Sequence, residues 1–429
     1  MLVAHLADTH LGLRQYGLSW REEDIYERFR EAIDVAVREG VDAILISGDM
    51  FDRARPPIRA IRVAMEALEE PRSRGIPVYV ILGEHDIPKV RDEPPQVLLR
   101  YVKLMGTHRT PDVDFLRVDG KEYVVAGVSH FPSRRKYLDR LRERIVAAAS
   151  KAGNRKSVLM LHQNISNVFG FEEGIDLSDI PKTFTYVAMG HIHMRKVLKT
   201  PDGVTVAYPG SIEILRSDEV RVWEGEGKGF YLVDLSSDEP TVSKVDLDVT
   251  PQAVVEADHP SHVPPVEDAL RKLLRMLKPG RRGILHVRIR MRADVQADPA
   301  SQIRELVRRR AGDTIYVRVS VERVAPDLMR AGRQALSAGE MVDEVSIVAS
   351  VISAPGNPGP TAVKVARSIV KLKNVLAGIE TGDVESAVEA ILSERDFWRP
   401  KVRTADEIPL SSITLRKPRS KGGLDAFLR

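Results

Sequence analysis

Short apolar runs alternate with stretches of helical periodicity over roughly the first 200 residues of the chain. The apolar runs occupy residues 2–6, 43–47, 78–82, 158–161 and 186–189, and the helical patterns occupy residues 23–38, 57–70 and 134–152. Short, continuously apolar strands separated by helices predict an α/β sheet that is buried on both faces. Residues 204–248 predict further strands with Gly-containing turns, as an antiparallel portion of the same domain.

The pattern changes after residue 250. Residues 250–268 are punctuated by Pro and His and predict a linker. A small α+β unit is predicted beyond it, from helices at 264–277 and 299–310 and strands at 284–291 and 314–323. A Gly/Pro-rich break at 353–361 precedes two short helical patterns. We therefore expect a first domain over residues 1–248, a second over 262–330, a helix hairpin over 361–399 and a basic flexible tail over 400–429.

Composition narrows the class of protein. The chain has no cysteine, so any metal ion must be held by histidine and carboxylate side chains. No apolar run approaches the ~18 residues that cross a bilayer, which predicts a soluble intracellular protein without membrane contact. The many charged residues and few amides suit a thermophile.

The small net charge of +4 hides a basic region in the second predicted domain. Residues 271–310 contain 13 Lys or Arg but only 3 acidic residues. Such a local excess is typical either of a surface that binds a polyanion or of a solvated charged face.

Candidate chemistry lies where the predicted strands end. Five apolar runs are each followed directly by side chains that ligate metals: Asp8, His10, Asp49, Glu84, His85, His162, His191 and His193. The carboxyl ends of parallel strands converge on one crevice, so we expect these side chains to lie together. His5, His108, His130, His259, His262 and His286 show no such grouping and are read as core or surface groups.

The set is too large for a single ion. Two divalent ions that share a bridging carboxylate would use it, and such a pair can clamp both the attacking and the leaving oxygen of a phosphoryl group. A mixed Asp and His set suits Mn, Fe or Zn better than Mg or Ca.

The motifs "DTH", "GD", "GEHD", "H" and "GHIH" in this order resemble those of calcineurin-like metallophosphoesterases. More narrowly, "HLADTHLGLRQYG", "ISGDMFDRARPP", "LMLHQN", "AMGHIHMRKV" and "YPGSIE" resemble the meiotic-recombination-eleven nucleases of archaea, called SbcD in bacteria. This resemblance implies a two-sheet α/β metallophosphoesterase domain followed by a small α+β cap domain and a C-terminal helix hairpin. It also implies a manganese-dependent exonuclease and endonuclease that processes broken double-stranded DNA in recombinational repair.

The resemblance assigns roles by position. One metal ion would be held by Asp8, His10 and His193, the other by Glu84, His162 and His191, and Asp49 would bridge the two. His85 would contact the scissile phosphate and help to protonate the leaving oxygen, and Asp86 would orient the His85 imidazole.

Two positions depart from the family pattern. Glu84 replaces an expected Asn, and its charge should tighten metal binding while lowering the Lewis acidity of the ion. Asp52 stands where archaeal and eukaryotic relatives tend to carry His, which puts in doubt any role assigned to that His.

The resemblance also implies partners. The basic cap would bind double-stranded DNA ends and hairpins, with Arg288, Arg290 and Arg292 as contacts and Arg216 as a phosphate contact near the active site. The hairpin would dock a Rad-fifty-type SMC-like ATPase through its apolar positions, which include Ile369, Leu372, Leu376, Val388 and Leu392. A homodimer, a cytoplasmic, nucleoid-associated location and a sliding-clamp contact through the tail "KGGLDAFLR" are further expectations.

Two alternatives stay open from the sequence. One is a phosphatase or phosphodiesterase for small substrates, which the basic cap and the docking hairpin disfavour. The other is a DNA-tethering subunit whose nuclease is weakened by Glu84.

Overall fold

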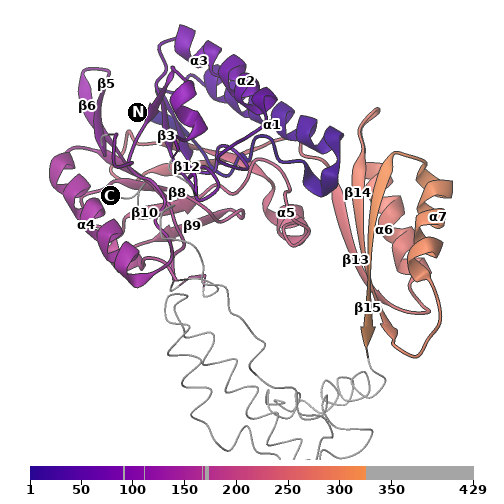
Figure 1. Cartoon of the computed structure of the whole chain (residues 1–429). Coiled ribbons are helices and arrows are strands. Elements are labelled where there is room, and N and C mark those ends of the chain that lie inside the picture. Colours follow the sequence, from indigo (N-terminus) through magenta and orange to yellow (C-terminus); the bar gives the residue numbers. More distant parts are fainter. Residues whose placement is uncertain (90–91, 111, 167, 170–172, 325–429) are drawn as a thin grey trace, which may run out of the picture. The chain divides into compact units, whose positions relative to one another are not determined.

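A computed structural model describes residues 1–89, 92–110, 112–166, 168–169 and 173–324 (Figure 1). These residues form two compact units. The first comprises Met1–Val254 with Leu273–Ile284, and the second comprises Val255–Lys272 with the described residues from Leu285 onward. The predicted docking hairpin at 361–399 and the predicted tail at 400–429 lie outside the described residues.

The first unit is built on two six-stranded mixed sheets. The first sheet has the order β12-β11-β1-β2-β3-β4, in which β1 to β4 are parallel and β11 runs antiparallel to both β1 and β12. Its strands are β1 (Leu2–Leu6), β2 (Ala43–Ser47), β3 (Val78–Ile81), β4 (Val102–Leu104), β11 (Gly229–Asp234) and β12 (Thr241–Asp246).

The second sheet has the order β5-β6-β7-β8-β10-β9, with four parallel strands at its centre and an antiparallel strand at each edge. Its strands are β5 (Val113–Val118), β6 (Lys121–Val128), β7 (Ser157–His162), β8 (Tyr186–Gly190), β9 (Lys196–Lys199) and β10 (Thr205–Tyr208). The prediction of a two-sheet α/β domain is confirmed.

Helices cover the outer faces of the two sheets. Figure 1 shows α1 (Ser19–Arg38), α2 (Ile58–Ala67) and α3 (Glu69–Ser73) on one side and α4 (Arg135–Ala152) on the other. Alternation along β2 explains the layers: Ile44 and Ile46 pack under the helices, whereas Ala43 and Leu45 pack against the second sheet. Strands buried on both faces must be apolar throughout, which is why they read as unbroken apolar runs.

The short helices of this unit are η1 (Gln15–Gly17), η2 (Pro95–Leu98), η3 (Leu177–Asp179) and α5 (Val220–Glu226). The α5 helix interrupts a region in which only strands were predicted. The predicted helix at 57–70 is split into α2 and α3 at Leu68, and the helices predicted at 23–38 and 134–152 are confirmed as α1 and α4.

The second unit contains β15 (Ile315–Val324), α7 (Pro299–Ala311) and most of β14 (Gly283–Arg292) and α6 (Val263–Met276). The Asp298 side chain caps α7 by accepting a hydrogen bond from the Ser301 N–H at 3.1 Å, and the helix ends before Gly312. The prediction that 250–268 is only a linker is wrong, because β13 (Gln252–Asp258) lies within it and pairs with β14. Within the part of the chain described, no helix has the length and apolar character to cross a membrane.

Candidate metal centre

The predicted ligands come from both sheets of the first unit and lie together. Asp8 and His10 follow β1, Asp49 follows β2, and Glu84 follows β3. His162 ends β7, and His191 and His193 follow β8. Asp8, His10 and His193 form one group whose ligand atoms all lie within 4.8 Å of one another, and Glu84, His162 and His191 form a second. Three further groups meet the same limit and overlap with these two; they bring in Asp49, Asp52 and His85.

Asp49 lies between the two groups. Its Oδ2 is 3.4 Å from His162 Nε2 and 3.8 Å from His10 Nε2, and its Oδ1 accepts a hydrogen bond from the His85 backbone N–H at 2.9 Å. One carboxylate oxygen therefore faces an imidazole of each group, as a bridging ligand would.

His162 gives a test of whether these residues fit a metal ion. Its Nδ1 lies 2.8 Å from the Ser47 carbonyl oxygen, and since a carbonyl only accepts, Nδ1 carries the hydrogen. The Nε2 atom is therefore the basic one; it is buried and has no hydrogen-bond partner among the residues that the structure describes. A buried basic nitrogen that faces the Asp49 carboxylate fits a metal ligand, with Ser47 fixing its tautomer.

His193 is held by a buried carboxylate that the sequence analysis did not identify. Its Nδ1 is 2.9 Å from Glu219 Oε1, and its Nε2 is 3.2 Å from His10 Nε2. Although burial favours the neutral acid, Lys228 and His193 lower the pKa of Glu219 to about 2. Glu219 also accepts hydrogen bonds from Lys228 and from the Leu215 N–H. It lies in an irregular loop, so no periodic pattern marked it.

The carboxylates give the centre a strong preference for positive charge. Burial disfavours the imidazolium of His10, but Asp52, Asp49 and Asp8 raise the pKa of His10 to about 9. Burial acts against the charged form of His162 as well, and there Asp49 raises the pKa of the ring to about 9. Bound divalent cations would satisfy the same electrostatic demand and displace these protons.

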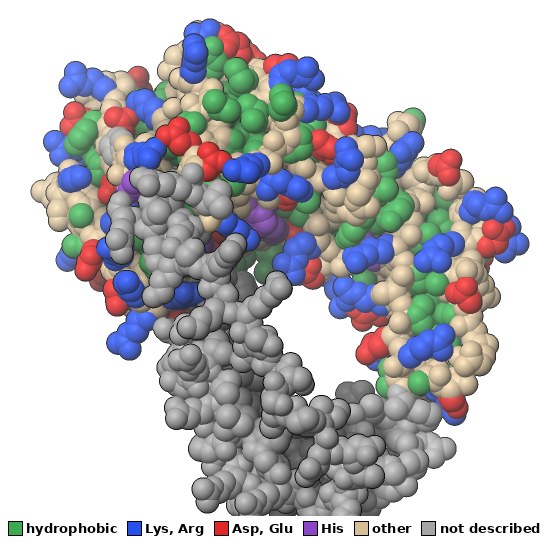
Figure 2. Space-filling model, in the orientation of Figure 1, with side chains coloured by type: hydrophobic (Ala, Val, Ile, Leu, Met, Phe, Trp, Pro, Cys, Tyr) green, Lys and Arg blue, Asp and Glu red, His purple; other side chains and the backbone are tan. Residues whose placement is uncertain are grey.

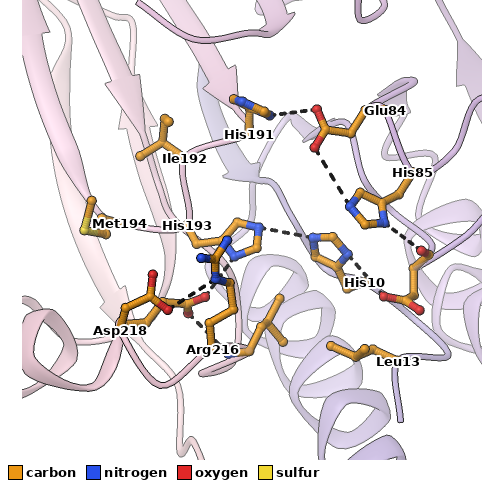
Figure 3. A pocket seen from close by; sticks show the side chains of 13 residues that line it. His10, Leu13, Glu84, His85, His191, Ile192, His193, Met194, Arg216 and Asp218 are labelled. Carbon is orange, nitrogen blue, oxygen red and sulfur yellow. Dashed lines mark hydrogen bonds and ion pairs between the residues drawn. The ribbon is translucent and has the colours of Figure 1, made fainter. Parts of the chain in front are cut away.

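Glu84 faces the second group from the loop after β3. Its Oε2 is 3.0 Å from His191 Nδ1, and its Oε1 is 3.9 Å from His85 Nε2 (Figure 3). Burial opposes ionisation, but the hydrogen bond and charge of His191 outweigh it and lower the pKa of Glu84 to about 2. Glu84 is thus an anion at neutral pH, where an Asn would be uncharged.

His85 lies at the cavity with 42% of its side chain exposed. The prediction that Asp86 orients its imidazole is wrong: the His85 Nδ1–H donates to the Asp52 carbonyl oxygen at 2.7 Å. Asp86 is instead fully buried and accepts hydrogen bonds from the backbone N–H groups of Met50, Phe51 and Gly83. Burial, together with the charge of Asp49, raises the pKa of Asp86 to about 6. Asp86 therefore shapes the loops that carry the ligands.

Backbone strain is concentrated at the centre. Asp8, His10, Asp49 and His191 all have positive φ, between 44° and 92°, a conformation that costs non-glycine residues energy. Close packing adds a second constraint: a Cβ on Gly83 would lie 2.1 Å from Asp49 Oδ1. The geometry of the ligands is therefore imposed by the surrounding fold.

A cavity of about 760 Å³ opens onto the centre. Its lining includes His10, His85, His191 and His193 together with Arg216 (Figure 3). Arg216 is 70% exposed and forms an ion pair with Asp218 at 3.2 Å. The cavity is large enough to admit a phosphate group beside the candidate ligands.

The other DNA-binding candidates lie on the second unit. Arg288, Arg290 and Arg292 alternate on the exposed face of β14. They form ion pairs with Glu256, Asp258 and Asp294, respectively, at 2.5 to 3.1 Å. In Figure 2, acidic side chains lie among the basic ones on this unit. Exposed ion pairs of this kind contribute only ~0–1 kcal/mol each, so phosphates can compete for these arginines.

Comparison with known proteins identifies relatives. Residues 1–195 match the calcineurin-like phosphoesterase family. The chain is 40% identical over 256 residues to the "DNA double-strand break repair protein Mre11" of Sulfurisphaera tokodaii, a match that covers 59% of this chain and 64% of that protein. The protein of the same name from Methanocaldococcus jannaschii is 37% identical, with 60% and 69% covered. That from Sulfolobus acidocaldarius is 33% identical, with 70% and 77% covered. The match to the first of these spans less than two thirds of its length.

Proposed function

The chain belongs to the Mre11 family of DNA double-strand break repair proteins, and on this premise we propose that it is a metal-dependent DNA nuclease. Its substrates would be double-strand-break ends and hairpins, cut by both exonuclease and endonuclease action during recombinational repair. The observation that carries the proposal is the pair of Asp/His groups joined by Asp49 beneath an open cavity.

Seven residues would hold two divalent ions. Mn²⁺ is the ion that we propose, because imidazole and carboxylate together suit it better than Mg²⁺ or Ca²⁺. Asp8, His10 and His193 would bind one ion, Glu84, His162 and His191 the other, and Asp49 both. When bound, such a pair neutralises charge on the phosphate and provides a strong nucleophile at neutral pH.

The protein's own groups would position and protonate the substrate. The Asp52 carbonyl fixes the His85 ring through Nδ1 and leaves Nε2 directed into the cavity. In its protonated form, His85 can donate the Nε2 proton to the leaving oxygen. Arg216, at the rim, can pair with a phosphate of the DNA backbone.

Binding of DNA would be independent of sequence and sensitive to salt, because arginines on the second unit would pair with phosphates. Each of Arg288, Arg290 and Arg292 would exchange its carboxylate partner for a phosphate. Replacing all three by Gln should weaken DNA binding. It should also reduce the slope of log affinity against log salt by about 0.9 for each phosphate that the variant no longer neutralises.

Further partners complete the proposal. A homodimer is supported by exposed apolar side chains, with Ile58 85% exposed and Met65 42% exposed on α2. Figure 2 shows hydrophobic side chains among the charged ones in the region of α2. Docking of a Rad-fifty-type SMC-like ATPase on 361–399 and of a sliding clamp on the tail remain proposals, as does a cytoplasmic, nucleoid-associated location.

One experiment separates the proposal from its rivals. The purified chain with Mn²⁺ is tested on labelled duplex ends, on a DNA hairpin and on a generic phosphate ester. Cleavage of the DNA substrates supports the nuclease. Ester turnover without DNA cleavage supports a small-substrate phosphatase, and DNA binding without turnover supports a tethering subunit.

Glu84→Asn tests the tethering alternative, which the negative charge of Glu84 favours. Asn removes this charge, so the variant should bind Mn²⁺ more weakly. If the carboxylate weakens the nuclease, cleavage at saturating Mn²⁺ should rise above that of the unmodified chain. Unchanged cleavage would show that Glu84 supports catalysis as well as an amide does.

A further inference from the structure

A buried pair of opposite charges, Glu219 and Lys228, contacts His193. Glu219 directly precedes α5 and Lys228 directly precedes β11 of the first sheet, whereas His193 follows β8 of the second sheet. The side chains of Lys228 and Glu219 are only 3% and 4% exposed, and Lys228 Nζ donates to Glu219 Oε2. Taking two charges out of water costs about as much free energy as their attraction returns, so stability alone is a weak reason for such a pair.

The Lys228 ammonium has a partner for each of its N–H groups. Besides Glu219, it donates to the His193 carbonyl oxygen and to Ser211 Oγ, each at 2.6 Å. An ammonium carries three donors and no acceptor, so these contacts satisfy it completely. Lys228 therefore holds His193 in two ways: directly through the backbone, and indirectly through the carboxylate that contacts the ring.

The two oxygens of Glu219 face different partners. Oε2 accepts hydrogen bonds from Lys228 and from the Leu215 N–H, the latter at 3.2 Å, whereas Oε1 lies 2.9 Å from His193 Nδ1. With Nδ1 occupied, the His193 ring presents Nε2 to the centre, 3.2 Å from His10 Nε2. Glu219 belongs to none of the groups of metal-ligating side chains in the described part of the chain, so it supports a ligand without being one.

This support distinguishes one ion site from the other. His162 is held by the uncharged Ser47 carbonyl, and His10 Nδ1 lies 3.8 Å from Asp52 Oδ1, beyond hydrogen-bond distance. A carboxylate at the far nitrogen of a ligating imidazole fixes the ring and raises its basicity, and its loss typically weakens metal binding ~10–100-fold. A change at Glu219 should therefore act on only one of the two ions.

We propose that Glu219 and Lys228 are positioning residues for His193 and thereby set the affinity of the metal ion that His193 binds. The inference rests on the proposed two-metal function and extends it to two residues outside the seven assigned ligands. A purely structural role, in which the pair only ties the loop before α5 to β11, is the competing explanation.

Three variants separate these roles. Glu219→Gln removes the charge at the His193 ring with little change of shape. The double variant Glu219→Gln/Lys228→Met also removes the ammonium that the single change leaves unpaired, so it should regain stability. Glu213→Gln is the matched control: Glu213 lies in the same loop between β10 and α5, is fully buried, and pairs with Arg21 at 3.3 Å rather than with a candidate ligand.

Binding of Mn²⁺ is measured by calorimetric titration, the pairing of the two ions by electron paramagnetic resonance, and stability by urea unfolding without metal. None of these measurements depends on DNA cleavage. We expect both Glu219 variants to bind one of the two ions at least about tenfold more weakly and to lose spin-coupled signal. The double variant should regain stability without regaining affinity, and Glu213→Gln should bind both ions as the unmodified chain does.

Unchanged Mn²⁺ affinity in Glu219→Gln would overturn the proposal. An equal loss of affinity in Glu213→Gln, or affinity that returns together with stability in the double variant, would show that the pair is only structural. If neither Glu219 variant folds, the NMR spectrum of the unmodified chain, with isotope-labelled histidine and bound Zn²⁺, decides the question. A hydrogen on His193 Nδ1 supports the proposal, and its absence rejects it.

These outcomes are distinct from failure of the proposed function. If the unmodified chain binds two ions and Glu219→Gln weakens one of them, but no DNA is cleaved, the proposed function fails while this inference stands. If the unmodified chain cleaves DNA and Glu219→Gln binds Mn²⁺ normally, only this inference fails.

Discussion

Acidification is expected to destabilise the first unit through His5, a histidine fully buried between the two sheets. Its Nε2 donates to the Met189 carbonyl oxygen at 3.1 Å, and its Nδ1 accepts a hydrogen bond from the Tyr186 hydroxyl at 2.8 Å. Burial lowers the pKa of His5 from 6.5 to about 3, because the core disfavours the imidazolium. Between these two pKa values the unfolded chain binds a proton that the folded chain does not, so stability falls as the pH falls.

The magnitude follows from the two pKa values. The free energy of unfolding should decrease by ~1.4 kcal/mol per pH unit below 6.5, which amounts to ~3 kcal/mol between pH 7 and pH 4. This loss is large beside the ~5–15 kcal/mol that usually stabilises a folded domain.

The assay is urea unfolding at pH 7 and pH 4 in metal-free buffer, followed by the fluorescence of Trp20 and Trp223 in the first unit. The His5→Gln variant keeps a donor for the Met189 carbonyl but cannot titrate, so subtracting its pH dependence cancels that of all other groups. The difference should be ~3 kcal/mol. Equal pH dependence of the unmodified chain and His5→Gln would refute the reasoning.

Two further predictions concern buried packing in the first unit. Gly83→Ala would place a Cβ 2.1 Å from Asp49 Oδ1, so it should lower the free energy of unfolding by ~1–3 kcal/mol and weaken Mn²⁺ binding. Gly225→Ala is the control, because the space around Gly225 is open. It should change neither the urea unfolding curve nor the Mn²⁺ titration. Arg21→Met should lower the free energy of unfolding by ~3–5 kcal/mol in urea, because it leaves the fully buried Glu213 carboxylate without its ion pair at 3.3 Å. Adding Glu213→Gln to this variant should recover part of the loss. If the two substitutions instead lower the free energy of unfolding by the sum of their separate effects, the pairing is contradicted.

The sequence by itself determined the elements and the kinds of side chain at their ends. Apolar runs of four or five residues predicted β1, β2, β3, β7 and β8. A strand that is buried on both faces has no solvent-exposed face, so apolar residues occupy successive positions along it. The same runs located the seven candidate ligands, since each stands within four residues of a strand end. The resemblance to the meiotic-recombination-eleven family is confirmed by the matches to Mre11 proteins, which show that the chain belongs to that family.

Only the tertiary structure decided which atoms meet. The partner of His162 Nδ1 is the Ser47 carbonyl, 115 residues away, and no local pattern carries that information. The support of His193 by Glu219 and the backbone role of Asp86 were missed for the same reason. Strand formation depends on neighbours along the chain, whereas the centre depends on how two sheets pack, and packing is a property of the whole fold.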